Sequence, residues 1–222
     1  MKRKLLLLSI LTFLSLSINS QTAVPDDAFE TYLETHDATG LVVSEGDASS
    51  LGDGTDGNNL VTTTKINGIT DLTLQYLGIE KLDGLEDFAA LENLTFYENN
   101  SNQTTVDLTA NTNLINIVIN GSVSLTTLNV AGLANVTKLY FVSSGVANLD
   151  VSSLVALTEL QLGNHSLLTS LNIKNGFNTN ITVASFNQNP LLNCITADAG
   201  IPALGLPNWS NNLNIVFDES CS

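Results

Sequence analysis

The chain contains few basic residues. Lysine and arginine together number 7 against 22 aspartates and glutamates, which gives a formal net charge of −15. So acidic a surface repels the phosphates of nucleic acid and the headgroups of anionic membranes, and we expect neither as a partner. The same charge is compatible with calcium or with a cationic partner, but a solvated acidic surface is the simplest interpretation.

Histidine is also scarce, which limits the catalytic and metal chemistry that the chain can support. Only His36 and His165 are present, and neither lies in a nucleophile-elbow or zinc-binding motif. The acidic segment 53–59 suggests a calcium loop, but Thr55 and Gly57 occupy two of the ligand positions of that motif. We therefore expect no cofactor, no resident metal and no enzymatic activity. A His–Ser or His–Asp pair assembled by the fold stays open as an alternative.

No apolar run of membrane-spanning length follows the first twenty residues. At the start, a basic segment at residues 2–4 precedes an apolar stretch over residues 5–18, and the small residue Ser20 offers a cleavage point. This pattern is typical of a secretory signal peptide over residues 1–20, with an uncleaved anchor as the alternative. We expect an exported protein, periplasmic or extracellular, that does not insert into a membrane. Cleavage would remove three basic residues and no acids, leaving a net charge of −18.

Cysteine occurs only twice, at Cys194 and Cys221, near the C-terminal end. Disulfides persist in exported proteins, and the even count suggests that the two are bonded to each other. Two buried thiols are the alternative. A catalytic cysteine is disfavoured, because neither has a histidine nearby in the sequence. The closed loop would stabilise the fold by about 3 kcal/mol through the lost entropy of the unfolded chain.

Repetition is what the chain has in abundance. An apolar-x-apolar pair recurs every 21 to 23 residues, and a second set of pairs recurs between the first at a similar period. Self-similarity of this kind predicts a solenoid with two short extended segments in each coil, and little helix after residue 92. The first pairs begin at Leu72, Leu94, Ile117, Leu139, Leu160 and Ile181, the last being Ile181-x-Val183, and the second pairs begin at Val106, Leu128, Leu149 and Leu171.

The segments outside the repeats are predicted to cap the ends of the solenoid. Residues 24–36 are typical of a short helix, with Pro25 in its first turn and an apolar stripe formed by Phe29, Tyr32 and Leu33. Residues 40–59 indicate a loop, and residues 60–66 an entering strand. We divide the chain into a signal peptide (1–20), an N-terminal cap (21–68), repeats (69–188) and a C-terminal cap (189–222). Trp209 is expected in the core of the last, with ligand stacking as the alternative.

Several stretches carry a family resemblance. Leu91-Glu-Asn-Leu-Thr-Phe-Tyr-Glu-Asn99 fits the consensus L-x-x-L-x-L-x-x-N, and Leu157-Thr-Glu-Leu-Gln-Leu matches its first half. With Val24-Pro-Asp-Asp-Ala-Phe-Glu and the C-terminal segment, the chain resembles secreted leucine-rich-repeat proteins of flavobacterial-type bacteria. The resemblance implies a mostly β solenoid with short parallel strands, an N-terminal helical cap and a C-terminal disulfide cap.

The chain also departs from that family. The consensus Asn is kept at Asn99, whereas Ser122, Ser144, His165 and Phe186 stand in its place in the later copies. The internal asparagine ladder of the family is therefore expected to be incomplete. Many relatives carry a C-terminal sorting domain, and the sequence shows none before Ser222, which puts attachment by that route in doubt.

The outward residues of the repeat strands contain the candidate binding site. Because strand residues alternate between faces, Tyr97, Val118, Tyr140 and Val142 are predicted to form one aromatic-apolar patch on the first sheet, beside Asn93 and Asn116. Tyrosine is enriched at binding hot spots, but aromatic and β-branched residues also simply favour strands. Outward residues at the same strand position in successive copies should stack into columns, and in the last copy these residues are expected to be Asn180, Thr182 and Ala184. On the second sheet, Asp107, Asn129, Asp150 and Asn172 indicate a polar ladder, with calcium binding as the weaker alternative.

These patterns favour an exported, monomeric, non-catalytic binding module that presents its first sheet to a protein or glycan partner. Two alternatives stay open. A β-helix type polysaccharide-degrading enzyme needs clustered Asp, Lys or Arg, but after Asn93 only Lys138 and Lys174 are basic and the acids are scattered. A structural adhesive or spacer without a specific ligand is the other.

Overall fold

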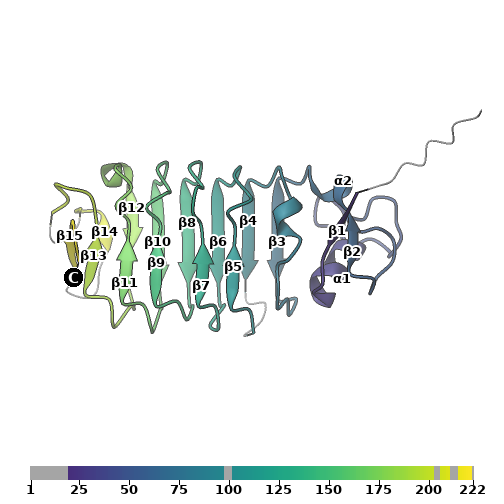
Figure 1. Cartoon of the computed structure of the whole chain (residues 1–222), viewed down its shortest axis with the longest axis horizontal. Coiled ribbons are helices and arrows are strands. Elements are labelled where there is room, and N and C mark those ends of the chain that lie inside the picture. Colours follow the sequence, from purple (N-terminus) through teal and green to yellow (C-terminus); the bar gives the residue numbers. More distant parts are fainter. Residues whose placement is uncertain (1–19, 98–101, 203–205, 211–214, 222) are drawn as a thin grey trace, which may run out of the picture.

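Each coil of the repeat region after the first contributes one strand to each of two faces, whereas the first coil contributes a strand to the first face alone. A computed structural model describes residues 20–97, 102–202, 206–210 and 215–221. Asn99 and all of the predicted signal peptide except Ser20 therefore lie outside the described residues. The coils stack in a nearly straight row between two caps (Figure 1). The predicted fold class, a mostly β repeat solenoid with an N-terminal helical cap and a C-terminal disulfide cap, is confirmed.

Both faces are built of parallel strands that follow one another in chain order along the repeats. The first sheet consists of β3 (Asp71–Gln75), β4 (Asn93–Tyr97), β6 (Asn116–Asn120), β8 (Lys138–Val142), β10 (Glu159–Gly163), β12 (Val183–Ser185) and β14 (Trp209–Ser210). The second face consists of β5 (Thr105–Asp107) with β7 (Thr127–Asn129), and of β9 (Asn148–Asp150), β11 (Ser170–Asn172), β13 (Cys194–Thr196) and β15 (Val216–Asp218).

The register of the sheets brings like side chains into inward rows. Leu94 pairs with Ile117, which pairs with Leu139, which in turn pairs with Leu160. These residues and their partners two positions on are buried, so the apolar pairs of successive coils form one continuous core. Each coil thus buries its apolar face against its neighbours, as a solenoid requires.

The last predicted first-sheet pair, Ile181-x-Val183, is wrong. Val183 points outward and is 43% exposed, whereas Ala184 and Phe186 are buried, and Ala184 pairs with Leu160. This coil is 24 residues long instead of 21, because the turn after β11 is longer and contains the 3₁₀ helix η2 (Asn178–Asn180). The outward residues of this coil are therefore Val183, Ser185 and Asn187, and not Asn180, Thr182 and Ala184.

The N-terminal cap contains the predicted helix, shortened to α1 (Asp27–Thr35). Asp26 is its N-cap, and its Oδ1 accepts the Phe29 amide at 2.9 Å. Phe29, Tyr32 and Leu33 are buried against the first coils, as predicted. The expected strand over 60–66 is only half right. Its first part, β2 (Leu60–Thr62), pairs antiparallel with β1 (Gln21–Ala23), but the chain then turns into the short helix α2 (Thr63–Ile66).

Two fully buried carboxylates organise the acidic loop of this cap. Glu30 accepts the amides of Asn58 and Leu60, and Glu34 accepts those of Asp53 and Gly54. Backbone N–H groups therefore bind both oxygens of Glu34 but only Oε1 of Glu30, whose Oε2 is buried without a hydrogen-bond partner among the described residues. The loop over residues 40–59 holds turns and isolated bridges, as predicted from its composition.

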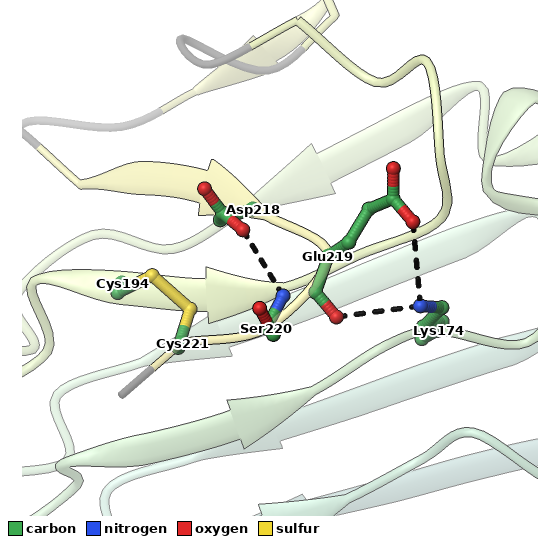
Figure 2. Close-up of a disulfide and its surroundings, with 6 residues drawn as sticks. All are labelled: Lys174, Cys194, Asp218, Glu219, Ser220 and Cys221. Carbon is green, nitrogen blue, oxygen red and sulfur yellow. Dashed lines mark hydrogen bonds and ion pairs between the residues drawn. A yellow bond between two sulfur atoms is a disulfide. The ribbon is translucent and has the colours of Figure 1, made fainter.

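The C-terminal cap closes the other end with aromatic packing and the predicted disulfide. Trp209 is buried, its Nε1 donates to the Ile181 carbonyl at 3.0 Å, and its ring packs on Phe186 and Phe217. Its predicted place in the core is thus confirmed. Figure 2 shows the bond between Cys194 and Cys221, which ties the segment after β15 to the start of β13.

Helix is rare elsewhere in the described part of the chain. The first return segment contains only the 3₁₀ helix η1 (Leu85–Asp87), and after residue 92 the described residues hold only η2. Among the described residues, no helix has the length and apolar character needed to span a bilayer.

Candidate binding surface

The six predicted site residues all lie on the outward face of β4, β6 and β8. Each is half-buried by its neighbours in the sheet. Val118 pairs directly with Tyr140, and Val142 follows two residues after Tyr140 on the same strand and the same face. These three side chains form a compact aromatic-apolar cluster.

Tyr97 belongs to a different outward column. It pairs with Asn120, and Asn120 pairs with Val142, so an amide side chain stands between the tyrosine and the valine. The strands of Tyr97 and Tyr140 are two spacings apart, roughly 10 Å. Val118 lies diagonally between them and is the one apolar link across the middle strand. The structure thus places two tyrosine centres separated by polar groups within the predicted patch.

A third tyrosine, Tyr76, also belongs to this surface, and it was not predicted from the sequence. It follows β3 directly, is 66% exposed, and packs edge-to-face on Tyr97 with ring centroids 5.5 Å apart. Its backbone is left-handed, with φ at 57°. The sequence signal that could have found it is its place one residue beyond an outward strand position in a tyrosine-poor chain with only 4 tyrosines.

The corner that Tyr76 occupies recurs in later coils. Its amide donates to the Tyr97 carbonyl of the next coil at 3.1 Å, and the equivalent amides of Gly121, Ser143 and Asn164 donate in the same way. These equivalent residues are also left-handed. Gly121 and Asn164 are residue types that tolerate this conformation, whereas Tyr76, Ser143 and Gln188, at the same corner of their coils, adopt it with strain.

The column beside the tyrosines is tied together by its own hydrogen bonds. The Asn116 amide donates to Asn93 Oδ1 at 2.6 Å, and the Asn93 amide donates to Asp71 Oδ1 at 2.9 Å. Further along the same column, Lys138 and Glu159 form an ion pair at 3.1 Å. The polar rim is therefore held in fixed orientations before any ligand arrives.

A cleft of about 290 Å³ borders this surface at its N-terminal edge. The loop of the N-terminal cap supplies Asp37 and Thr39, the buried Tyr32 forms part of its wall, and β3 supplies Asp71 and Thr73. Because Asp71 and Thr73 also face outward on the first sheet, the cleft and the sheet face are one continuous surface.

Ser144 and His165 meet inside the solenoid and not at its surface. His165 is fully buried, and its Nδ1 accepts hydrogen bonds from the Ser144 amide at 3.3 Å and hydroxyl at 2.8 Å. Its Nε2 donates to the Phe141 carbonyl at 2.9 Å. Burial lowers the pKa of His165, so the ring is neutral with its proton on Nε2. The pair has the contact of a nucleophile and base, but no substrate can reach it.

This internal contact is part of an incomplete polar ladder, as predicted. The His165 amide donates to Asn189 Oδ1 at 3.0 Å, and the Asn189 side chain donates to the carbonyls of Leu162 and Phe186. Asn189 therefore fills the consensus position, and the prediction that Phe186 replaces it is wrong because the last coil is longer. The ladder is broken at Ser122, whose buried hydroxyl has no hydrogen-bond partner among the described residues.

On the second face, the predicted ladder of Asp107, Asn129, Asp150 and Asn172 forms as two pairs in separate sheets, Asp107 with Asn129 and Asp150 with Asn172. Each Oδ1 accepts the amide two residues further on, and the Asn129 amide donates to Asp107 at 3.2 Å. The Thr109 amide lowers the pKa of Asp107. Burial alone would raise the pKa of Asp150, but hydrogen bonds from Ser152 and Asn172 outweigh it and lower the pKa. Within the described residues, no group of three or more His, Cys, Asp or Glu side chains is arranged to hold a metal.

No family model and no curated protein matches the chain. Among solved structures, it is similar to one described as "Functional domain of InlJ from Listeria monocytogenes includes a cysteine ladder". The two share 23% identity with a TM-score of 0.44, over 92% of this chain. The chain spans about half of that structure, 48% of its length.

Proposed function

We propose that the chain is an exported, non-catalytic binding module that holds a partner on the outward face of its first sheet. The binding surface is centred on Tyr76, Tyr97 and Tyr140, with Val118 and Val142 between and beside them. The partner is a protein or a glycan, and the module acts as a monomer that binds neither nucleic acid nor membrane.

The exposed ring of Tyr76, packed on Tyr97, is the observation that carries this proposal. A side chain in the left-handed region costs about 1 kcal/mol or more, and the equivalent corners of later coils hold Gly121, Ser143, Asn164 and Gln188 in the same conformation. The left-handed corner therefore belongs to the repeat, and what sets Tyr76 apart is its aromatic side chain. Tyr76 gains an exposed ring packed on Tyr97, which is a surface for a ligand more than a support for the core.

Rigid presentation is the mechanism. The strands beneath the tyrosines are hydrogen-bonded on both sides, and the polar rim of Asn93 and Asn116 is already fixed by mutual hydrogen bonds. Little side-chain or backbone freedom is lost when a partner docks on such a surface. This preorganisation supports a binding role.

Export is supported by the disulfide and by the basic-apolar start of the sequence. The bond between Cys194 and Cys221 is of a kind that persists in oxidising compartments. The first described strand, β1, begins at Gln21, directly after the expected cleavage point. We place the mature protein in the periplasm, at the cell surface or in the medium of a flavobacterial-type bacterium.

A capture experiment with the purified mature chain tests the proposal. The double variant Tyr97→Ala, Tyr140→Ala should lose capture of the partner from extracts of the native environment while it unfolds at a similar temperature. Phe177→Ala is the matched control, because Phe177 is 49% exposed in the turn after β11, away from the tyrosines in the fold. Undiminished capture by the double variant would show that the tyrosine face is not the site.

A further inference from the structure

The outward face of the first sheet carries almost no free charge, although the protein as a whole is strongly acidic. The only charged residues in the seven strands of this sheet are Asp71, Lys138 and Glu159. Lys138 and Glu159 neutralise each other at 3.1 Å, and Asp71 accepts the Asn93 amide at 2.9 Å. The remaining outward positions hold chiefly threonine, asparagine, glutamine, serine, valine and tyrosine.

We infer that this face binds a neutral polysaccharide chain, an inference that rests on the proposed function and specifies its ligand. Each ring of a neutral sugar presents C–H groups that pack on an aromatic face, and hydroxyls that both donate and accept hydrogen bonds. Amide and hydroxyl side chains have the same double capacity. The surface offers both kinds of partner in alternation, with Asn120 between Tyr97 and Val142 and with Thr95 beside Val118.

Charge disfavours the other polymers. A net charge of −15 repels anionic polysaccharides and other polyanions. A cationic chain would find only Asp71 and Glu159 on the strands of this face, and each already has a partner. A neutral polymer meets neither obstacle.

The arrangement of the tyrosines also suits a polysaccharide better than a protein. The centres of protein interfaces are apolar and contiguous, with a polar rim around them. Here the aromatic centres are spread over β4, β8 and the corner that follows β3, with Asn120 and Thr95 among them. A long, narrow ligand that crosses the strands would contact Tyr140, Val118, Tyr97 and Tyr76 in turn.

The cleft beside β3 gives this path a polar end. Asp71 and Thr73 line both the sheet face and the cleft of about 290 Å³, and Asp37 and Thr39 face them from the cap loop. A chain end that leaves the tyrosines would enter a pocket rich in hydrogen-bond acceptors and hydroxyls. Sugar hydroxyls, which are donors as well as acceptors, match this lining.

Affinity electrophoresis of the purified mature chain tests the inference with defined probes. The gels contain hydroxyethylcellulose, glucomannan, arabinoxylan or laminarin as neutral polymers, polygalacturonate as an anionic one and chitosan as a cationic one. We expect retardation by at least one neutral polymer and insensitivity of that retardation to added salt. The affinity should fall at least about tenfold in Tyr97→Ala, Tyr140→Ala and stay unchanged in Phe177→Ala.

Three outcomes would overturn the inference in different ways. If no neutral polymer retards the chain but tyrosine-dependent capture of another molecule persists, the ligand class is wrong and the proposed binding face stands. If neither retardation nor tyrosine-dependent capture is found, both the ligand class and the face are wrong. Salt-sensitive retardation by chitosan or polygalacturonate alone would also contradict a neutral ligand.

Discussion

Tyr76 packs edge-to-face on Tyr97, with the ring centroids 5.5 Å apart and the ring planes at 67°, and it does so from a left-handed backbone corner. The same corner in a later coil is occupied by Asn164, which tolerates that conformation. The contact therefore joins a strained residue to a relaxed strand residue on the outward face. Tyr76 stays 66% exposed in this contact, so most of its surface is available to a ligand.

Replacement of Tyr76 by asparagine should separate stability from binding. The relief of backbone strain, about 1 kcal/mol, offsets the lost ring contact, about 0.5–1.5 kcal/mol, so the free energy of unfolding should change by less than about 1 kcal/mol. Binding should fall about tenfold. The reverse exchange, Asn164→Tyr, should destabilise the fold by about 1–2 kcal/mol, because it adds the strain in another coil. Denaturant unfolding and a binding titration measure both effects, and a large loss of stability in Tyr76→Asn would assign Tyr76 a structural role.

His165 should make stability depend on pH just below neutrality. Burial lowers its pKa in the folded state below the usual 6.5, so the unfolded chain binds a proton first as the pH falls. The stabilisation is thus fully present above about pH 6.5 and is lost progressively as the pH falls from there through the folded pKa.

The variant His165→Asn places an uncharged amide in the same row as Asn189. It should remove the change in unfolding free energy that begins as the pH falls below 6.5. The change at lower pH should remain, because the carboxylates of Asp107 and Asp150 also have lowered pKa values in the folded state. Urea unfolding of both proteins across this range checks the difference. Identical pH profiles would show that His165 does not titrate on unfolding.

Gly52 should be intolerant of any side chain. A Cβ at Gly52 would overlap the carboxylate of Glu34, which is fully buried and holds the amides of Asp53 and Gly54. Gly52→Ala should therefore cost at least about 2 kcal/mol of unfolding free energy through overpacking and loss of these hydrogen bonds. Gly68→Ala is the control, since nothing lies near its Cβ position and its φ is not positive. Equal stability of the two variants would refute the role given to Glu34.

The disulfide should contribute chiefly to the C-terminal cap. Cys194 and Cys221 are 27 residues apart, and closure of a loop of that size stabilises a fold by about 3 kcal/mol. Replacement of both cysteines by serine should lower stability by about that amount and increase hydrogen exchange first in β13 and β15. Unchanged exchange in these strands would mean that the Trp209 packing holds the cap without the bond.

The sequence determined the coil architecture because the inward rows are regular. Leu94, Ile117, Leu139 and Leu160 are apolar at nearly constant spacing, and the strands form where that period places them. The period placed one strand wrongly, at Val183. Ile181 is buried although it lies before the strand, and a β-branched valine two residues later fits the apolar-x-apolar pattern although its side chain points outward. A longer turn at η2 cannot be seen in a pattern of apolar pairs alone.

The candidate site was only partly predictable for a related reason. Tyr97 and Tyr140 follow from the alternation of strand faces, whereas Tyr76 lies at a corner whose left-handed backbone has no signature in a tyrosine. The contact between Ser144 and His165 depends on the fold, which brings equivalent positions of adjacent coils together. The spacing of apolar residues predicts the length of a coil, but it does not predict which polar side chains of adjacent coils form hydrogen bonds in the interior.

The measurement that bears most directly on the binding role is the affinity of the mature chain and of Tyr97→Ala, Tyr140→Ala for the same captured ligand. A titration of both proteins and of Phe177→Ala, each checked for an unchanged unfolding midpoint, isolates the tyrosine face. At least about a tenfold loss in the double variant, with none in the control, is the result we predict. Equal affinity of all three folded proteins would contradict a binding site on the first sheet.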